Sequence, residues 1–160
     1  MGCITNVSFA VLINGAASPF FKSQRGLRQG CPLSPLLFLI VAEGLSRLIH
    51  KARRSNKIKG IEVALNLYIT HLLFVDDILI FSNGSYDELK EYKIIIDLFM
   101  KATGMQINYG KSQVCVAGYN RRECNTMSDL FPFHLQPLAS PFKYLGFWLK
   151  PDAYKNEDWN

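Results

Sequence analysis

Two stretches of this chain place apolar residues at the spacing of an α-helix, and the first of them begins at Ser34-Pro35. Serine followed by proline is typical of a helix start, with serine as the N-cap and proline at the first helical position. Apolar side chains then recur on one face at Leu37, Val41, Leu45, Leu48 and Ala52. The pattern predicts a helix from about Pro35 to Arg53.

The second helical stretch follows Ser85-Tyr86-Asp87-Glu88, a polar cluster with the spacing of a capping box. Gly104 supplies a residue that readily adopts the left-handed conformation found at helix ends. Between these signals the apolar stripe runs through Leu89, Tyr92, Ile96, Phe99 and Ala102. We therefore predict a second helix that stops at Gly104.

The other apolar segments are short, rich in β-branched and aromatic residues, and bounded by turn residues, which is typical of strands. Asn14-Gly15 is a strong signal for a two-residue turn, so we predict a hairpin with strands at Val7 to Ile13 and Pro19 to Phe21. Further strands are predicted at Ile61 to Val63, Leu67 to Val75, Ile78 to Phe81, Gln113 to Ala117 and Phe142 to Lys150.

The order of these segments predicts an α+β fold. Helix, β hairpin, helix and strand are what remains of a ferredoxin-like βαββαβ unit without its first strand, with an antiparallel sheet and two helices. Of the 160 residues, 49% are hydrophobic, which is enough to form a core. We therefore expect residues 1–160 to form one domain.

The cysteines stand far apart and form no Cys-x-x-Cys pair: Cys3, Cys31, Cys115 and Cys124. Neither a disulfide framework nor a zinc site is indicated, so we expect reduced thiols and an intracellular location, with nucleus and cytoplasm both open. The longest apolar run, Leu36 to Ala42, ends at Glu43. It is far shorter than the roughly 20 residues that a membrane-spanning helix needs, so no membrane partner is expected.

Basic residues are concentrated in the first third of the chain, from Met1 to Lys59. Nine lysines and arginines lie there with one acid, Glu43, whereas the rest of the chain carries nine basic and twelve acidic residues. Such clustering favours a phosphate-bearing partner. The alternative is that the run Lys51 to Lys59, which contains Arg53 and Arg54, is simply a solvated helix end.

Two adjacent carboxylates, Asp76-Asp77, interrupt an apolar stretch that runs from Leu72 to Phe81. Because the flanks are expected to be buried, two like charges there would be costly without a cation, and Mg²⁺ favours carboxylate oxygens. Strand side chains alternate between faces, so both carboxylates can serve one metal centre only if they sit in a hairpin turn. The alternative is an ordinary polar turn.

A glycine- and proline-rich loop leads into the first predicted helix, with the sequence Arg25-Gly26-Leu27-Arg28-Gln29-Gly30-Cys31-Pro32-Leu33-Ser34-Pro35. A helix N-terminus attracts phosphate, glycines allow a ligand to approach the backbone, and arginines pair with phosphate oxygens. As a string, this loop resembles the loop-helix motif of reverse transcriptases. Its Gln-Gly-Cys-Pro-Leu-Ser-Pro form is similar to that of LINE-type, non-LTR retrotransposons of a plant-like kind.

Other segments resemble further motifs of that family, in the family's order. Phe74-Val75-Asp76-Asp77 resembles the aromatic-x-Asp-Asp box, Gly104 to Ser112 the next motif with its Asn-x-x-Lys-Ser, and Tyr144-Leu145-Gly146 the primer-grip element. The resemblance covers Arg25 to Lys150 and implies part of a polymerase palm.

The resemblance implies an RNA-directed DNA polymerase that uses Mg²⁺ or Mn²⁺, an RNA template, a DNA primer and deoxynucleoside triphosphates. It assigns metal binding and catalysis to Asp76 and Asp77. It makes Lys111 the proton donor to pyrophosphate, with a surface lysine in a turn as the alternative. The nucleotide pocket would be lined by Arg28, Gln29 and Gly30. Primer and template contacts would fall to Phe74, Tyr144, Leu145, Gly146, Arg25, Arg53 and Arg54, although Tyr144 to Gly146 also fits an ordinary edge strand.

The chain departs from the family's pattern before Glu43, because no acid precedes that residue. The family's first motif carries the aspartate that would be the third metal ligand. We therefore interpret the chain as a truncated or decayed copy, with Met1 an internal methionine, and expect residues 1–160 alone to be inactive. Two other functions stay open: a non-catalytic nucleic-acid-binding remnant and a host-adopted interaction protein. The exposed aromatic strand motif of RNA-recognition domains is not evident.

Overall fold

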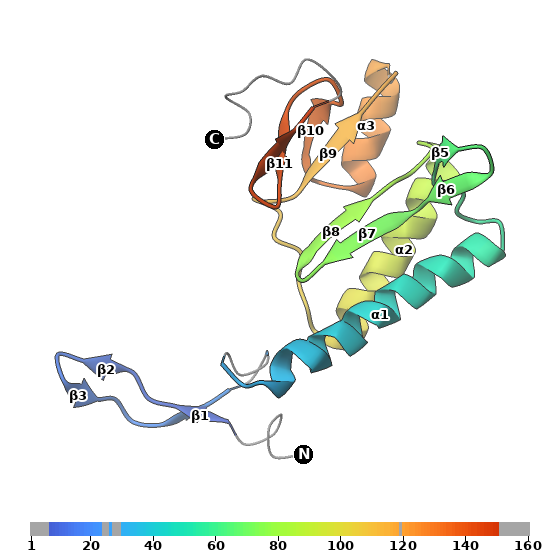
Figure 1. Ribbon diagram of the computed structural model, residues 1–160. Helices are drawn as coiled ribbons and strands as arrows, with labels where there is room; N and C mark the ends of the chain where they lie inside the picture. Colours follow the sequence, from blue (N-terminus) through green and yellow to red (C-terminus); the bar gives the residue numbers. More distant parts are fainter. Residues whose placement is uncertain (1–6, 24–25, 27–29, 119, 151–160) are drawn as a thin grey trace.

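The computed structural model describes residues 7–23, 26, 30–118 and 120–150, and its first described segment is a β-hairpin arm. Strand β1 (Ser8–Phe9) pairs with β4 (Phe21–Lys22), and β2 (Leu12–Ile13) pairs with β3 (Ala16–Ala17). The predicted Asn14-Gly15 turn is confirmed, with both residues at positive φ. The return strand starts at β3 rather than at Pro19. In Figure 1 this arm extends away from the rest of the molecule.

Helix α1 (Leu33–Arg54) confirms the first predicted helix but begins two residues earlier. The predicted N-cap at Ser34 is wrong, because the cap is Pro32 and Ser34 already lies inside the first turn. Pro35 is tolerated there because the first amides of a helix have no partner within the helix. The predicted apolar face is confirmed, and Leu45 and Ala52 are buried on it.

By length and composition alone, α1 is the one helix in the described part that is long and apolar enough to cross a membrane. The apolar run from Leu36 to Ala42 is much shorter than this helix. The helix reaches the necessary length because it continues past Glu43, and its mean hydropathy stays high despite isolated charges. A core helix of a soluble protein passes the same test. The expectation that no membrane is involved stays a prediction.

Four short strands follow α1 and form two hairpins: β5 (Ile61–Ala64) with β6 (Leu67–Ile69), and β7 (His71–Phe74) with β8 (Asp77–Ile80). The prediction of one strand from Leu67 to Val75 is wrong. The chain passes from one hairpin to the other at Thr70, whose side chain is buried. The pairing partner changes there, so the segment from Leu67 to Val75 contains two strands that meet at the polar residues Thr70 and His71.

Helix α2 (Tyr86–Thr103) has the predicted extent, and its C-cap Gly104 has φ +73°. The predicted capping box is wrong, because the Ser85 side chain makes no cap hydrogen bond. The Glu88 carboxylate instead turns into the protein and accepts hydrogen bonds from the backbone amides of Lys59, Gly60 and Asn83. Glu88 therefore joins the start of α2 to the two hairpins.

The C-terminal part is a βαβ unit followed by a small hairpin. Strand β9 (Gln113–Val116) confirms a prediction, whereas α3 (Arg121–Leu130) and β10 (His134–Pro137) were not predicted. Strand β10 is parallel to β9. The predicted single strand from Phe142 to Lys150 is wrong, because β11 (Phe142–Tyr144) and β12 (Phe147–Leu149) pair across a turn.

The strands of the described residues form six separate pairs, one of them parallel, rather than the antiparallel sheet that the sequence predicted. The structure also has a third helix. The mixed α+β class is therefore confirmed, while the ferredoxin-like arrangement stays a prediction. The core consists mainly of residues from α1, α2 and α3, and its buried apolar members are Leu45, Ile49, Ala52, Ile58, Tyr92, Ile95, Met127 and Phe131.

Candidate active site

Asp76 and Asp77 lie at the end of the β7–β8 hairpin, but the prediction that both form its turn is confirmed for Asp76 and wrong for Asp77. Val75 and Asp76 form the turn, and Asp77 opens β8 opposite Phe74. Both carboxylates are exposed. Within the part of the chain that the structure describes, neither forms a hydrogen bond or an ion pair. The pair is therefore free to accept an external ligand.

The expectation that both flanks of this pair are buried is wrong. Leu72, Phe74 and Ile78 are exposed, whereas Leu73 and Ile80 pack against the core. Alternate residues of a strand point to opposite faces, and β7 and β8 form a two-stranded ribbon with one face on the core. Burial of the flanks therefore does not explain the carboxylates at the tip.

Backbone strain marks this turn. Val75 has φ +51°, in the left-handed region. A β-branched residue is rare there, and such conformations cost about 1–3 kcal/mol and cluster at functional sites. Val75 therefore holds a strained backbone conformation directly before the carboxylate pair.

Two contacts establish how residues 68–71 run along α1. The Arg53 guanidinium donates to the carbonyl oxygen of Tyr68 at 3.4 Å, and Ser46 Oγ lies 2.9 Å from His71 Nε2. As the chain advances from Tyr68 to His71, its contact on α1 moves back from Arg53 to Ser46. Both distances are about 10 Å, because a strand rises about 3.3 Å and a helix 1.5 Å per residue. The two segments run antiparallel.

The same geometry directs the β7–β8 turn toward the start of α1. The three strand residues after His71 add about 10 Å, which corresponds to about seven helix residues and reaches the level of Leu39, and the turn with Asp76 lies beyond them. In Figure 1 the β7–β8 turn lies at the end of the molecule where α1 begins. Gly30 precedes this helix by three residues, so Gly30 and the carboxylate turn both lie toward the N-terminal end of α1.

Two glycines of this loop have the backbone freedom that the sequence analysis required. Gly26 and Gly30 have φ +82° and +77°, and nothing lies within 4 Å of a Cβ added at either. The predicted residues Arg25, Arg28 and Gln29 lie outside the described residues. The part of the predicted nucleotide pocket that is described is therefore Gly30, which is exposed.

The structure places Arg53 and Arg54 at the opposite end of α1, about 21 Å along the helix from the level that β7 reaches at Phe74. The Arg53 guanidinium is bound to the Tyr68 carbonyl, and Lys57 pairs with Glu91 at 3.1 Å. Arg54 is exposed. The basic cluster is thus a separate surface and not a wall of the carboxylate site.

Lys111 lies in a turn between α2 and β9, where its backbone amide donates to the Asn108 carbonyl at 3.0 Å. The Ser112 hydroxyl donates to the same carbonyl. The Lys111 side chain is exposed. Both the catalytic role and the surface-lysine alternative therefore stay open.

Tyr144, Leu145 and Gly146 lie where β11 turns into β12. Leu145 has φ +52° and Gly146 φ +90°, so both turn residues are left-handed. Tyr144 is half-buried, and the other two are exposed. The edge-strand alternative is wrong for Leu145 and Gly146, because they form a turn. The glycine in second place was the signal for it.

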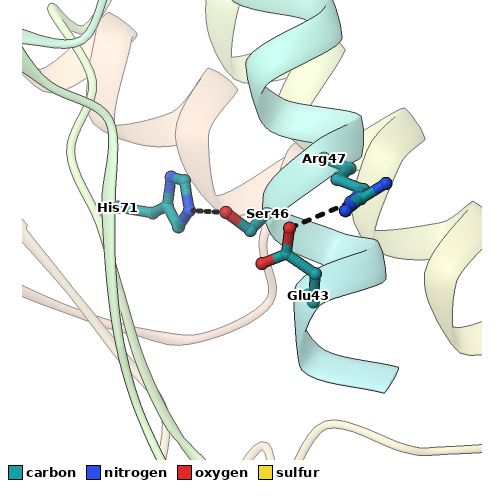
Figure 2. A network of polar contacts seen from close by, with 4 residues as sticks. All are labelled: Glu43, Ser46, Arg47 and His71. Atoms are coloured by element: carbon teal, nitrogen blue, oxygen red, sulfur yellow. Dashed lines mark hydrogen bonds and ion pairs between the residues drawn. The ribbon is translucent and has the colours of Figure 1, made fainter. Parts of the chain in front are cut away.

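Figure 2 shows a polar network on α1 that the sequence analysis did not identify. His71 Nε2 lies 2.9 Å from Ser46 Oγ, and its Nδ1 lies 2.9 Å from Thr70 Oγ1. Burial lowers the pKa of His71, the neighbouring His50 lowers it further, and Glu43 acts in the opposite direction. His71 therefore fastens the start of β7 to α1 as a neutral imidazole. No local sequence pattern indicates this contact between distant segments.

The chemistry of the donors at the hairpin tip fits a hard divalent cation. Asp76 and Asp77 offer oxygen ligands without internal partners, and Mg²⁺ in proteins is commonly held by one or two carboxylates together with water. Within the described residues, no group of three or more His, Cys, Asp or Glu side chains could hold a metal ion. The tip is thus a two-carboxylate site without a third acidic ligand from the described residues.

An exposed carboxylate pair on a hairpin tip and an open glycine before a long helix are the features of the described residues that a comparison can interpret. In comparison with known proteins, residues 2–149 match the family "Reverse transcriptase (RNA-dependent DNA polymerase)". The chain belongs to this reverse transcriptase family.

Two relatives refine the assignment. An uncharacterized mitochondrial protein of Arabidopsis thaliana is 48% identical over 67 residues, which are 41% of this chain and 55% of the relative. The retrovirus-related Pol polyprotein from type-1 retrotransposable element R2 of Popillia japonica is 26% identical over 171 residues, which are 99% of this chain and 27% of the polyprotein. The resemblance to LINE-type, non-LTR reverse transcriptases is thereby confirmed. The chain spans about half and about a quarter of these relatives.

Proposed function

We propose that residues 1–160 contribute part of the palm of an RNA-directed DNA polymerase, with Asp76 and Asp77 as metal ligands. One observation carries this proposal: two adjacent carboxylates without internal partners stand on a strained turn. An ordinary polar turn needs no strained valine, and its acids commonly bind the local backbone. Membership of the reverse transcriptase family supports the same assignment.

The bound ions would stabilise negative charge on the attacking and leaving oxygens during nucleotidyl transfer. In this proposal the Gly30 loop lies next to the triphosphate, because its backbone is open and it precedes a helix N-terminus. Phe74 lies opposite Asp77 and is exposed, so it can contact the primer end. Lys111 would donate a proton to pyrophosphate. Arg28 and Gln29 would complete the nucleotide pocket, and Tyr144 to Gly146 would contact the primer.

Metal binding tests the proposal directly. We expect Mn²⁺ to bind weakly to residues 1–160 and to broaden the NMR signals of the β7–β8 turn, because two carboxylates provide part of an octahedral shell. Asp76→Asn should abolish this broadening. Asp87→Asn is a matched control, since it removes the same charge from an exposed acid in the first turn of α2. Equal broadening in the wild type and in Asp76→Asn would show that the assignment is wrong.

A second function is favoured by the surface at the end of α1. Lys51 and Arg54 are exposed there, close to Arg53. Clustered cations attract nucleic-acid phosphates without regard to sequence. We propose that this surface binds the template or primer backbone away from the carboxylate site. A non-catalytic remnant would keep this binding while losing the metal site, so the two assays separate the alternatives.

A further inference from the structure

The hydroxyl of Tyr92 lies where the β7–β8 hairpin leaves the core. Tyr92 is in the middle of α2 and is 1% exposed. Its hydroxyl oxygen lies 2.9 Å from the carbonyl oxygen of Phe81 and 3.1 Å from that of Thr70. Thr70 immediately precedes β7 and Phe81 immediately follows β8. One phenol therefore joins both strands at the base of the hairpin that carries the carboxylate pair.

The Tyr92 hydroxyl stays a donor throughout the physiological pH range. Burial raises its pKa, the Glu88 carboxylate raises it further, and Arg53 acts in the opposite direction by a smaller amount. A protonated phenol can donate to the Phe81 carbonyl, which then remains paired although it is partly buried. The Thr70 carbonyl also accepts from the Phe81 amide at 2.9 Å. The base is thus closed by two hydrogen bonds, one from the Tyr92 hydroxyl to the Phe81 carbonyl and one from the Phe81 amide to the Thr70 carbonyl.

The tip of the hairpin depends on this base. His71 is fastened to α1 through Ser46, and Tyr92 holds the other side from α2. Asp76 lies in the turn that follows the four residues of β7, or about 15 Å from the base at Thr70. A rotation of the base by about 4° would therefore move the carboxylates by about 1 Å, which is enough to matter for metal ligation and for catalysis.

We propose that Tyr92 is a positioning residue for Asp76 and Asp77, and that its hydroxyl sets the direction of the β7–β8 hairpin from the α2 side. The inference rests on the proposed metal-binding function of the pair. The Tyr92 ring belongs to the core, so its packing explains why an aromatic residue stands there. Packing does not explain the hydroxyl, because phenylalanine would fill the same space. The hydroxyl is explained by its contacts with the two carbonyl oxygens at the hairpin base.

The test is Tyr92→Phe in residues 1–160, with two matched controls. Tyr68→Phe removes a hydroxyl that donates to Glu62 at 2.9 Å on the neighbouring hairpin. Ile95→Val shortens a buried side chain on the same helix and lowers stability while keeping both hydroxyl contacts of Tyr92. The affinity for Mn²⁺ is measured by electron paramagnetic resonance, and the exchange rate of the Phe81 amide is measured by NMR. Conditions are chosen under which every variant is folded.

We expect Tyr92→Phe to weaken Mn²⁺ binding and to speed exchange of the Phe81 amide, each by about three- to tenfold, which is the worth of one hydrogen bond. Tyr68→Phe and Ile95→Val should bind Mn²⁺ like the wild type. A role in general stability alone would make Ile95→Val and Tyr92→Phe alike, so that result overturns the inference.

Two further outcomes distinguish the positioning role of Tyr92 from the proposed metal binding by Asp76 and Asp77. Wild-type Mn²⁺ binding that Asp76→Asn abolishes and Tyr92→Phe leaves unchanged overturns the positioning role while the metal site stands. Identical binding by the wild type and Asp76→Asn overturns the metal site, and the positioning role with it.

Discussion

Replacing Glu88 by glutamine should destabilise the fold more than any change of an exposed acid. The Glu88 carboxylate is 3% exposed and accepts from the amides of Lys59 at 2.8 Å, Asn83 at 3.1 Å and Gly60 at 3.2 Å. One carboxylate oxygen takes the Lys59 amide and the other takes the remaining two. Glutamine keeps one acceptor oxygen, and its NH₂ group would face an amide donor on the other side.

The size of the effect follows from these contacts. Glutamine can keep the bonds to Gly60 and Asn83 as neutral bonds but leaves the Lys59 amide without an acceptor. An unsatisfied buried donor costs about 1–3 kcal/mol, and bonds to charged groups are worth about 1.5–3 kcal/mol against about 1 for neutral ones. We therefore expect a loss of about 2–4 kcal/mol in the free energy of unfolding. In a domain of this size that corresponds to a melting temperature lower by roughly 5–15 °C.

Urea unfolding followed by circular dichroism measures this loss, and Glu91→Gln is the matched control. Glu91 lies three residues farther along α2 and pairs with Lys57, whose side chain is largely exposed. Pairs of this kind contribute about 0–1 kcal/mol. If Glu88→Gln lowered the free energy of unfolding by less than about 0.5 kcal/mol, or by no more than Glu91→Gln does, the three amide contacts would not stabilise the fold as proposed.

The other predictions concern acidity, nucleic acid and chemistry. Because burial lowers the pKa of His71 in the fold, the unfolded chain binds the proton more readily, so stability should fall as the pH drops below about 6.5, by at most about 1.4 kcal/mol per unit. His71→Gln should remove that part of the slope, and equal slopes would contradict the assignment. Replacing Lys51 and Arg54 by alanine should weaken binding to single-stranded RNA and reduce its dependence on the logarithm of salt concentration by about 1.4, whereas an unchanged slope would exclude this surface. Residues 1–160 alone should not extend a primer on an RNA template with Mg²⁺, because the described residues provide two clustered acids and not the third that a two-metal centre needs. Primer extension that Asp77→Asn abolishes would disprove this.

Features encoded by neighbouring residues were predictable from the sequence. The Asn14-Gly15 turn, the apolar face of α1, the stop of α2 at Gly104 and the turn at Asp76 each depend on a few adjacent residues. Helix α3 was missed although Asn120 and Glu123 form a capping box at its start. Its apolar residues are sparse, so the helical period is weak. The capping signal was present and would have identified the helix start.

Partners distant in sequence were not predictable from local patterns. Ser85 and Glu88 have the spacing of a capping box, yet the carboxylate binds backbone amides of residues 59, 60 and 83. Local spacing shows which bonds a side chain can make. It does not show which donors or acceptors the fold brings close to that side chain. For Glu88, three hydrogen bonds from amides outside the helix stabilise the carboxylate more than the one bond that a capping box would provide.

The candidate site shows the same division between local chemistry and distant geometry. Asp76 and Asp77 could be identified because acids in an apolar stretch are unusual, but their relation to Gly30 depends on the direction in which β7 runs along α1. Two contacts that no motif contains determine that direction, Arg53 with Tyr68 and Ser46 with His71. Motifs more than forty residues apart therefore lie toward the same end of α1, because β7 runs antiparallel to the helix. A substitution at Ser46 or His71 would change the alignment of the two motifs while leaving every residue of both in place.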